Sequence, residues 1–150
     1  MRREYPPAPL VAVAAFVLRG GRFLLVRRAA EPGRGKWSIP GGVVRLGERL
    51  REAVVREVAE ECGLIVEVVD LLDVVETIIR DEAGRIRFHY VIVDYLARPV
   101  GGTLRPSDDA LEARWASVEE ALGMDITNTL RRLLEEHGDK LRSLAELWSL

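Results

Sequence analysis

Three glutamates stand close together in one segment and form the most distinctive acidic group of the chain. Glu57, Glu60 and Glu61 lie within a stretch whose apolar spacing predicts a helix over 48–62. At about 100° per residue, their carboxylates fall on one arc of roughly 100°. Like charges at this spacing repel one another, and a divalent cation would neutralise them. Oxygen ligands without Cys or His favour Mg²⁺ or Mn²⁺ over zinc.

The apolar face of the predicted helix determines where these carboxylates can lie. Val54, Val55, Val58 and Cys62 share the arc that is expected to pack on the core. Arg56 is expected to lie partly on the solvent side, so the glutamates sit at the edge of the buried face. From the three glutamates alone, a solvated acidic patch is as good an interpretation as a metal site. The surrounding residues are needed to distinguish the two.

The glutamates belong to a longer pattern of fixed spacing. It begins at Gly42 and Glu48 and continues, after seven residues, as Arg56-Glu57-Val58-Ala59-Glu60-Glu61-Cys62-Gly63-Leu64. The pattern G-x5-E-x7-R-E-U-x-E-E-x-G-U, with U a bulky aliphatic residue, resembles the Nudix box at every defined position. Similarity to the Nudix hydrolase family covers roughly residues 10 to 122. It implies an α/β (α+β) fold, a Nudix-type α/β/α sandwich with a mixed central sheet and a loop-helix-loop metal site.

The resemblance implies metal-binding roles for the acidic residues. Glu57 and Glu61 would be the main ligands of Mg²⁺, for which Mn²⁺ could substitute. Glu60 would be a further ligand, and the backbone carbonyl of Gly42 would join them. These residues would therefore carry both the metal and the catalysis.

Neighbouring residues would support that site. By the same resemblance, Glu48 and Arg56 would pair and brace the loop against the helix. Gly41 would let the backbone approach metal and phosphate closely. Arg28, at the end of a predicted strand near the box, would bind phosphate. Trp37 would either stack on a nucleobase or pack in the core.

The general base is not singled out by the family pattern. It can be a glutamate of the box or an acid in a late loop, where this chain has Ser107-Asp108-Asp109 and Glu112. Glu112 ranks first, because strand alternation places it on the face shared with Arg114. Asp109 is the other late-loop candidate.

The resemblance implies hydrolysis of the pyrophosphate bond in a nucleoside diphosphate linked to another moiety. ADP-ribose, giving AMP and ribose 5-phosphate, is the leading substrate, because residues 32–37 are similar to relatives called ADP-ribose pyrophosphatases. A proline that this subgroup often carries beyond the box is absent, since Ile78 and Ile79 stand there. The alternatives are a (d)NTP pyrophosphohydrolase that removes oxidised nucleotides and, in another class, a non-catalytic nucleotide sensor. Such sensors usually have eroded box carboxylates, whereas here all are present.

The rest of the sequence predicts the elements that position these residues. Apolar runs bounded by turn residues predict strands over 10–18, 23–28, 37–39, 64–80, 85–97 and 111–116. The run over 64–80 is expected to be bent or broken. Further helices are predicted from Ser117, over 127–137 and, after a break at Gly138, over 139–148. Helices on both faces of a mixed sheet would bury these elements.

Composition and charge limit the class of protein. A chain of 150 residues suits a single domain, with 1–8 as an N-terminal tail and 138–150 as a C-terminal helical extension. A net charge of −2 gives no basic field for nucleic acid, and no apolar run approaches the roughly 20 residues of a membrane span. The single cysteine, Cys62, fits a cytoplasmic location. The expected partner is a small-molecule nucleotide substrate, and the resemblance implies a homodimer.

Overall fold

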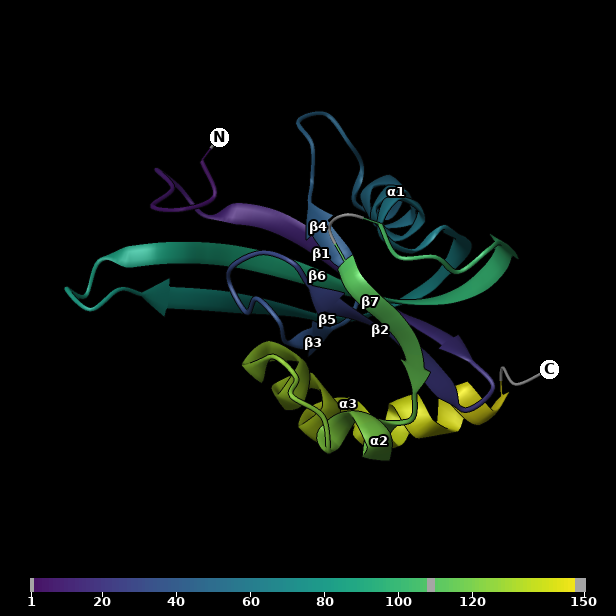
Figure 1. Ribbon diagram of the computed structural model, residues 1–150. Helices are drawn as coiled ribbons and strands as arrows, with labels where there is room; N and C mark the ends of the chain where they lie inside the picture. The colour runs from purple at the N-terminus through teal and green to yellow at the C-terminus, as the bar shows by residue number, and fades with distance from the viewer. Residues whose placement is uncertain (1, 108–109, 148–150) are drawn as a thin grey trace.

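A mixed sheet forms the centre of the computed structural model, which describes residues 2–107 and 110–147 (Figure 1). The strands are β1 (Leu10–Arg19), β2 (Arg22–Arg28), β3 (Trp37–Ser38), β4 (Gly41–Val43), β5 (Leu64–Arg80), β6 (Ile86–Gly102) and β7 (Ala110–Ala116). The helices are α1 (Leu50–Cys62), α2 (Val118–Leu122) and α3 (Asn128–Leu147). Within the described residues, no helix has both the length and the apolar character needed to cross a membrane.

The sheet combines parallel and antiparallel pairs. Its strand order is β3-β2-β1-β6-β5, with β4 also paired to β1 and β7 also paired to β2. β1 and β6 run parallel, whereas the other pairs are antiparallel. The pairing of β4 with β1 sets Gly42 opposite Val13 and Gly41 opposite Ala14. The start of the box is therefore fixed to a central strand of the sheet.

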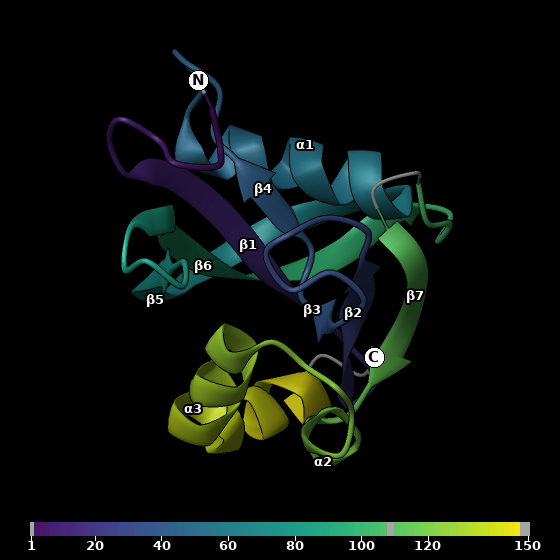
Figure 2. The same ribbon diagram turned by 60° about the vertical axis from the view of Figure 1, so that its left-hand side comes forward.

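Helices cover both faces of this sheet (Figure 2), and each face has its own apolar core. On one face, Val58 and Cys62 of α1 pack in a cluster with Val13. On the other face, Leu130 and Leu134 of α3 belong to a cluster that α2 completes. The predicted α/β/α sandwich with a mixed sheet is confirmed.

β5 is a single strand, and its pairing with β6 is irregular. The register shifts at four places along the pair, between Ile65 and Val66 and again around Val69, Leu72 and Arg80. Each bulge bends the strand and increases its twist. The predicted bend is confirmed, and the strand is not broken.

α3 continues through Gly138, where a break and a second helix were predicted. That prediction was wrong, because Gly138 is buried and Leu134 and Leu141 on either side of it are buried too. Glycine costs a helix about 1 kcal/mol relative to alanine. Burial of a continuous apolar face outweighs that cost. Trp148, the predicted end of the helix, lies outside the described residues.

Replacing Gly138 with alanine is expected to stabilise the protein by about 0.5–1 kcal/mol, because the unfolded chain loses freedom. A Cβ there would lie 3.3 Å from the movable Arg142 Nη1 and 3.6 Å from Val118. Urea unfolding followed by circular dichroism measures the change. Gly63→Ala is the contrasting variant and should destabilise, since φ is +75° and the Cβ would collide with the Thr103 carbonyl oxygen. A loss of stability in Gly138→Ala as large as that in Gly63→Ala would contradict the packing described around Gly138.

Candidate active site

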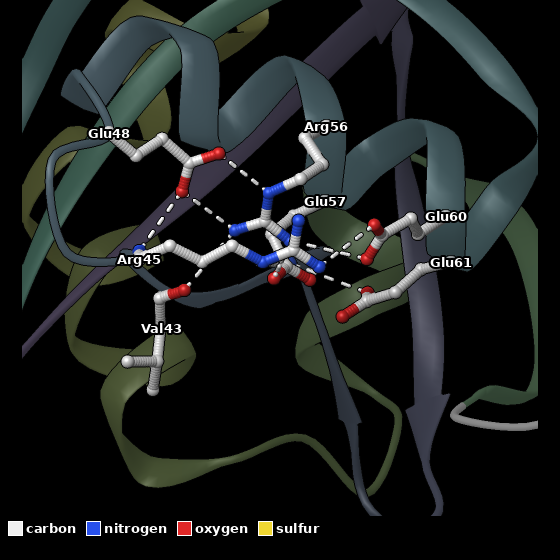
Figure 3. A network of polar contacts seen from close by, with 8 residues as sticks. Val43, Arg45, Glu48, Arg56, Glu57, Glu60 and Glu61 are labelled. Carbon is white, nitrogen blue, oxygen red and sulfur yellow. Dashed lines mark hydrogen bonds and ion pairs between the residues drawn. The ribbon is translucent and has the colours of Figure 1, made fainter. Parts of the chain in front are cut away.

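The acidic residues lie on α1, whose end and buried face fix their direction. Gly63 ends the helix in the left-handed region with φ 75°, and its N–H donates to the Ala59 carbonyl oxygen. Val54, Val58 and Cys62 are buried against the sheet, which confirms the predicted core arc. The carboxylates are left at the margin of that buried face, next to the loop that precedes the helix (Figure 3).

Arg56 is the centre of the polar network at this margin (Figure 3). Its Nε lies 2.6 Å from Glu48 Oε2, and its Nη2 lies 2.9 Å from Glu48 Oε1. Its Nη1 donates to Glu57 Oε1 at 2.7 Å and to Glu60 Oε2 at 3.2 Å. Nη2 also donates to the Val43 carbonyl oxygen at 3.3 Å. One guanidinium thus joins three carboxylates to the backbone of the loop.

The position of Arg56 differs from the one predicted. Only 16% of its side chain is exposed, whereas the helical arc placed it partly on the solvent side. The prediction was wrong because it treated α1 alone. Val43, at the end of β4, and Glu48, in the loop that follows, cover this side of the helix. The bidentate pair also affects ionisation: hydrogen bonding to Arg56 lowers the pKa of Glu48 to about 2.

Two glycines bring the main chain against the carboxylates. The Gly41 N–H donates to Glu61 Oε2 at 3.4 Å. A Cβ at Gly41 would collide with the Val13 carbonyl oxygen of β1, and a Cβ at Gly42 would collide with the carboxylate of Glu57. Both positions therefore require glycine for close approach, which agrees with the backbone role expected from the sequence.

Arg45 is a member of the network that the sequence analysis missed. Its Nη2 lies 3.4 Å from Glu60 Oε1, and its backbone N–H donates to Glu48 Oε1 at 3.0 Å. Glu60 is half exposed, so this contact lies at the rim of the cluster. Arg45 falls in the unconstrained spacer between Gly42 and Glu48, where the pattern gives no signal for it.

Arg28 lies at the end of β2, close to the acidic cluster. Its Nε donates to the Pro32 carbonyl oxygen at 2.6 Å, which orients the guanidinium. Burial lowers the pKa of Arg28, and the negative charge of Glu61 is the first of the effects that oppose this. A partly buried cation therefore stands near the carboxylate of Glu61, as a phosphate-binding group would require.

Glu112 is not brought to the acidic cluster. It lies opposite Arg27 in the pairing of β2 with β7, and its Oε1 is 3.1 Å from Arg27 Nη1. The neighbouring Val26 packs in the core beneath α1, so strand alternation turns Arg27 and Glu112 to the other face. Asp109, the other late-loop candidate, lies outside the described residues.

Trp37 also belongs to the face away from α1. Its side chain packs against the core beneath α2 and α3. Its backbone bonds to Asp125 and Thr127, and the Arg114 guanidinium carbon lies 6.0 Å from its ring centroid. Of the two roles left open for Trp37, the packing role is the one these contacts show.

The bidentate pair makes stability depend on pH in a defined direction. Since the pKa of Glu48 falls from 4.5 to about 2 on folding, its stabilisation is complete above about pH 4.5 and declines as pH falls towards 2. Glu48→Gln should therefore be less stable than the wild type at pH 7, and the difference should narrow at pH 3. Urea unfolding at both values measures it.

A matched control is available on the same helix. Glu52 is exposed, and its Oε1 lies 3.8 Å from Arg49 Nε, so Glu52→Gln should change stability little at either pH. If Glu48→Gln lowers the free energy of unfolding by as much at pH 3 as at pH 7, the pH dependence does not come from the Glu48–Arg56 pair and this account of it is contradicted.

Comparison with known proteins agrees with this architecture. A model of the NUDIX domain matches residues 8–137. An ADP-ribose pyrophosphatase of Methanocaldococcus jannaschii is 39% identical over 71% of this chain and 61% of its own length. The 8-oxo-dGDP phosphatase NUDT18 of Homo sapiens is 37% identical over 73% of this chain and 35% of its own length. The chain thus spans about three fifths of the archaeal relative and about a third of the human one.

Solved structures give the same result. A MutT NUDIX hydrolase from Burkholderia pseudomallei is 35% identical with a TM-score of 0.75, over 85% of this chain and 97% of that one. The NUDIX domain of Shewanella oneidensis NrtR, complexed with ADP ribose, is 25% identical with a TM-score of 0.71, over 91% and 90%. With the box complete and its carboxylates gathered on α1, the chain belongs to the Nudix hydrolase family.

Proposed function

We propose that the protein is a Mg²⁺-dependent hydrolase of the pyrophosphate bond in nucleoside diphosphate derivatives. The observation that carries this proposal is the gathering of box carboxylates against a glycine backbone, with Arg28 beside them. Such a bond is flanked by negative phosphoryl oxygens, which repel an attacking water unless cations shield them. The site combines carboxylates that hold a cation with a guanidinium that binds phosphate directly.

The donor set fits a hard divalent cation. Glu57 and Glu61 would hold Mg²⁺ or Mn²⁺ together with the Gly42 carbonyl oxygen, and Glu60 would be a further ligand. All of these donors are oxygens, which suits these ions. The missing Cβ at Gly42 leaves the backbone in contact with the Glu57 carboxylate, as joint ligation would need. When bound, the ion polarises the P–O bonds and lowers the pKa of water.

The other residues orient the cluster and the substrate. Arg56 holds Glu57 by a bond of 2.7 Å and is itself held by Glu48, so the ligand is positioned by a fixed pair. Arg28 would bind a phosphoryl oxygen pair with its planar guanidinium. We assign the general base to a glutamate of α1, since Glu112 is held on the opposite face by Arg27.

ADP-ribose is the substrate that we propose first, with AMP and ribose 5-phosphate as products. Its support is the name of the Methanocaldococcus jannaschii relative and the ADP ribose bound to the NrtR domain. The name of the human relative favours an oxidised guanine nucleotide as a second candidate. Product identification separates them, because an oxidised guanine nucleotide would give its nucleoside monophosphate together with pyrophosphate from a triphosphate or phosphate from a diphosphate. A sensor without catalysis is disfavoured by the complete set of carboxylates. The buried free thiol of Cys62 suits the reducing cytoplasm, where we place the reaction.

Loss of a proposed ligand should abolish most of the activity. Changes to residues that only support a metal ligand typically reduce activity by about 10- to 100-fold. Glu57→Gln should therefore lower kcat on ADP-ribose by more than about 100-fold, whereas the exposed Glu52→Gln should leave it nearly unchanged. The assay measures AMP release with and without Mg²⁺. Tight ADP-ribose binding without hydrolysis of any diphosphate substrate, unaffected by Glu57→Gln, would instead indicate a sensor.

We also propose a homodimer, formed through the edge of the sheet. β5 is the last strand in the sheet order, and it exposes five large apolar side chains: Ile65, Val69, Leu71, Val74 and Ile78. An exposed apolar edge strand favours pairing with a second chain. A second copy of this chain would cover these side chains and extend the sheet.

Light scattering during gel filtration tests the dimer. The wild type should have about twice the chain mass of 16.8 kDa, and the Val74→Lys variant should have the mass of a monomer. Val100→Lys is the matched control, because Val100 is equally apolar and exposed but lies on β6. A monomeric wild type, or a dimer that survives Val74→Lys, would contradict this interface.

A further inference from the structure

A second group of ligand-type side chains lies between α3 and β5, on the face of the sheet away from α1. Asp73, Glu136 and His137 each offer one ligand atom, and these atoms lie within 4.8 Å of one another. His137 Nε2 is 2.7 Å from Asp73 Oδ2 and 3.8 Å from Glu136 Oε2. We propose that these three side chains bind a divalent transition-metal ion, such as Zn²⁺, at a site separate from the Nudix box.

The fold holds the two sides of this site in register. The hydroxyls of Thr77 and Thr129 are 2.8 Å apart, which gives a second contact between β5 and α3. From Thr129 to His137 the helix rises about 12 Å, at 1.5 Å per residue. From Thr77 to Asp73 the strand covers about 13 Å, at 3.3 Å per residue. These matching lengths bring His137 level with Asp73.

Asp94 supplies an independent indication of a ligand. It is 1% exposed, and among the residues that the structure describes its Oδ2 has no hydrogen-bond partner. Asp94 lies opposite Asp73 in the β5–β6 pair, where Cβ atoms are about 4.5–5.5 Å apart. Leu96, two residues along β6, packs in the core beneath α3, so Asp94 faces the same side.

A hydrogen bond between Asp73 and His137 alone leaves Asp94 unexplained. A buried carboxylate without a partner is costly, and a second carboxylate beside it adds repulsion. A cation held at Asp73 would offset both effects. The protein would thereby gain a metal link between its C-terminal helix and the sheet.

The ligand set indicates the class of ion. An imidazole with two carboxylates suits zinc and neighbouring transition metals, whereas Mg²⁺ favours oxygen ligands alone. Metal–ligand distances of about 2.0–2.2 Å place the donors of a tetrahedral site about 3.3 Å apart. The distances from His137 Nε2, 2.7 Å and 3.8 Å, lie on either side of that value. Small side-chain rotations would therefore complete the geometry, and partial exposure leaves room for water.

Co²⁺ is a suitable probe, because its visible absorption reports ligation in a low-coordinate site. The titration should use the full chain with Glu57→Gln and Glu61→Gln, so that the box does not compete. We expect one Co²⁺ per chain, displaced by Zn²⁺, and a melting temperature raised by about 5–10 °C at about 100-fold excess of Zn²⁺ over Kd. Absence of both the absorption bands and the thermal shift would overturn the proposal.

Variants of the ligands complete the test in the same background. His137→Gln and Asp73→Asn should each weaken Co²⁺ affinity by more than about tenfold, and Asp94→Asn by about tenfold. Glu135→Gln, exposed on the same helix, is the control and should bind as tightly as the parent. If His137→Gln does not fold, the exposed Glu136→Gln still tests ligation. Undiminished binding in folded ligand variants would overturn the proposal and leave Asp73 and His137 as a simple hydrogen-bonded pair.

Discussion

The ion pair between Arg56 and Glu48 is the interaction on which the candidate active site depends. Glu57, Glu60 and Glu61 of α1 and Glu48 of the preceding loop bring four carboxylates together, and these would repel one another. The Arg56 guanidinium offsets this repulsion with bonds to Glu48, Glu57 and Glu60. Through Val43 it also attaches the preceding loop to the helix. Removal of this one cation would free the loop and the carboxylates together.

Strand pairing in the sheet fixes the positions of the groups around this network. Because β4 pairs with β1, Gly41 and Gly42 are fixed to a central strand while their backbone lies against the carboxylates of α1. β2, the neighbour of β1, ends at Arg28 and so brings a cation to the same place. The box carboxylates and Arg28, the phosphate-binding group that we propose, therefore lie near one another. The opposite face of the sheet, covered by α2 and α3, carries Trp37 and the ion pair of Arg27 with Glu112.

The features predicted correctly from the sequence are local ones. Fixed spacing identified the box, and apolar periodicity located α1 and the strands other than β4, because both depend on residues close together in the chain. The strand β4 (Gly41–Val43) and the last residues of β6, up to Gly102, were not predicted. The burial of Arg56, the face occupied by Glu112 and the continuity of α3 at Gly138 depend on packing between distant segments. For the same reason the pair of Asp73 and His137, 64 residues apart, had no signal in the sequence.

A crystal structure of the protein with Mn²⁺ tests the central claim most directly, because anomalous scattering locates the ion independently of activity. The proposed function predicts an anomalous peak about 2.1 Å from carboxylate oxygens of Glu57 and Glu61, with the Gly42 carbonyl oxygen as a further ligand. The proposed function would be contradicted if Mn²⁺ fully occupied a site elsewhere in the crystal while α1 carried no anomalous peak and Arg56 remained bound to Glu57.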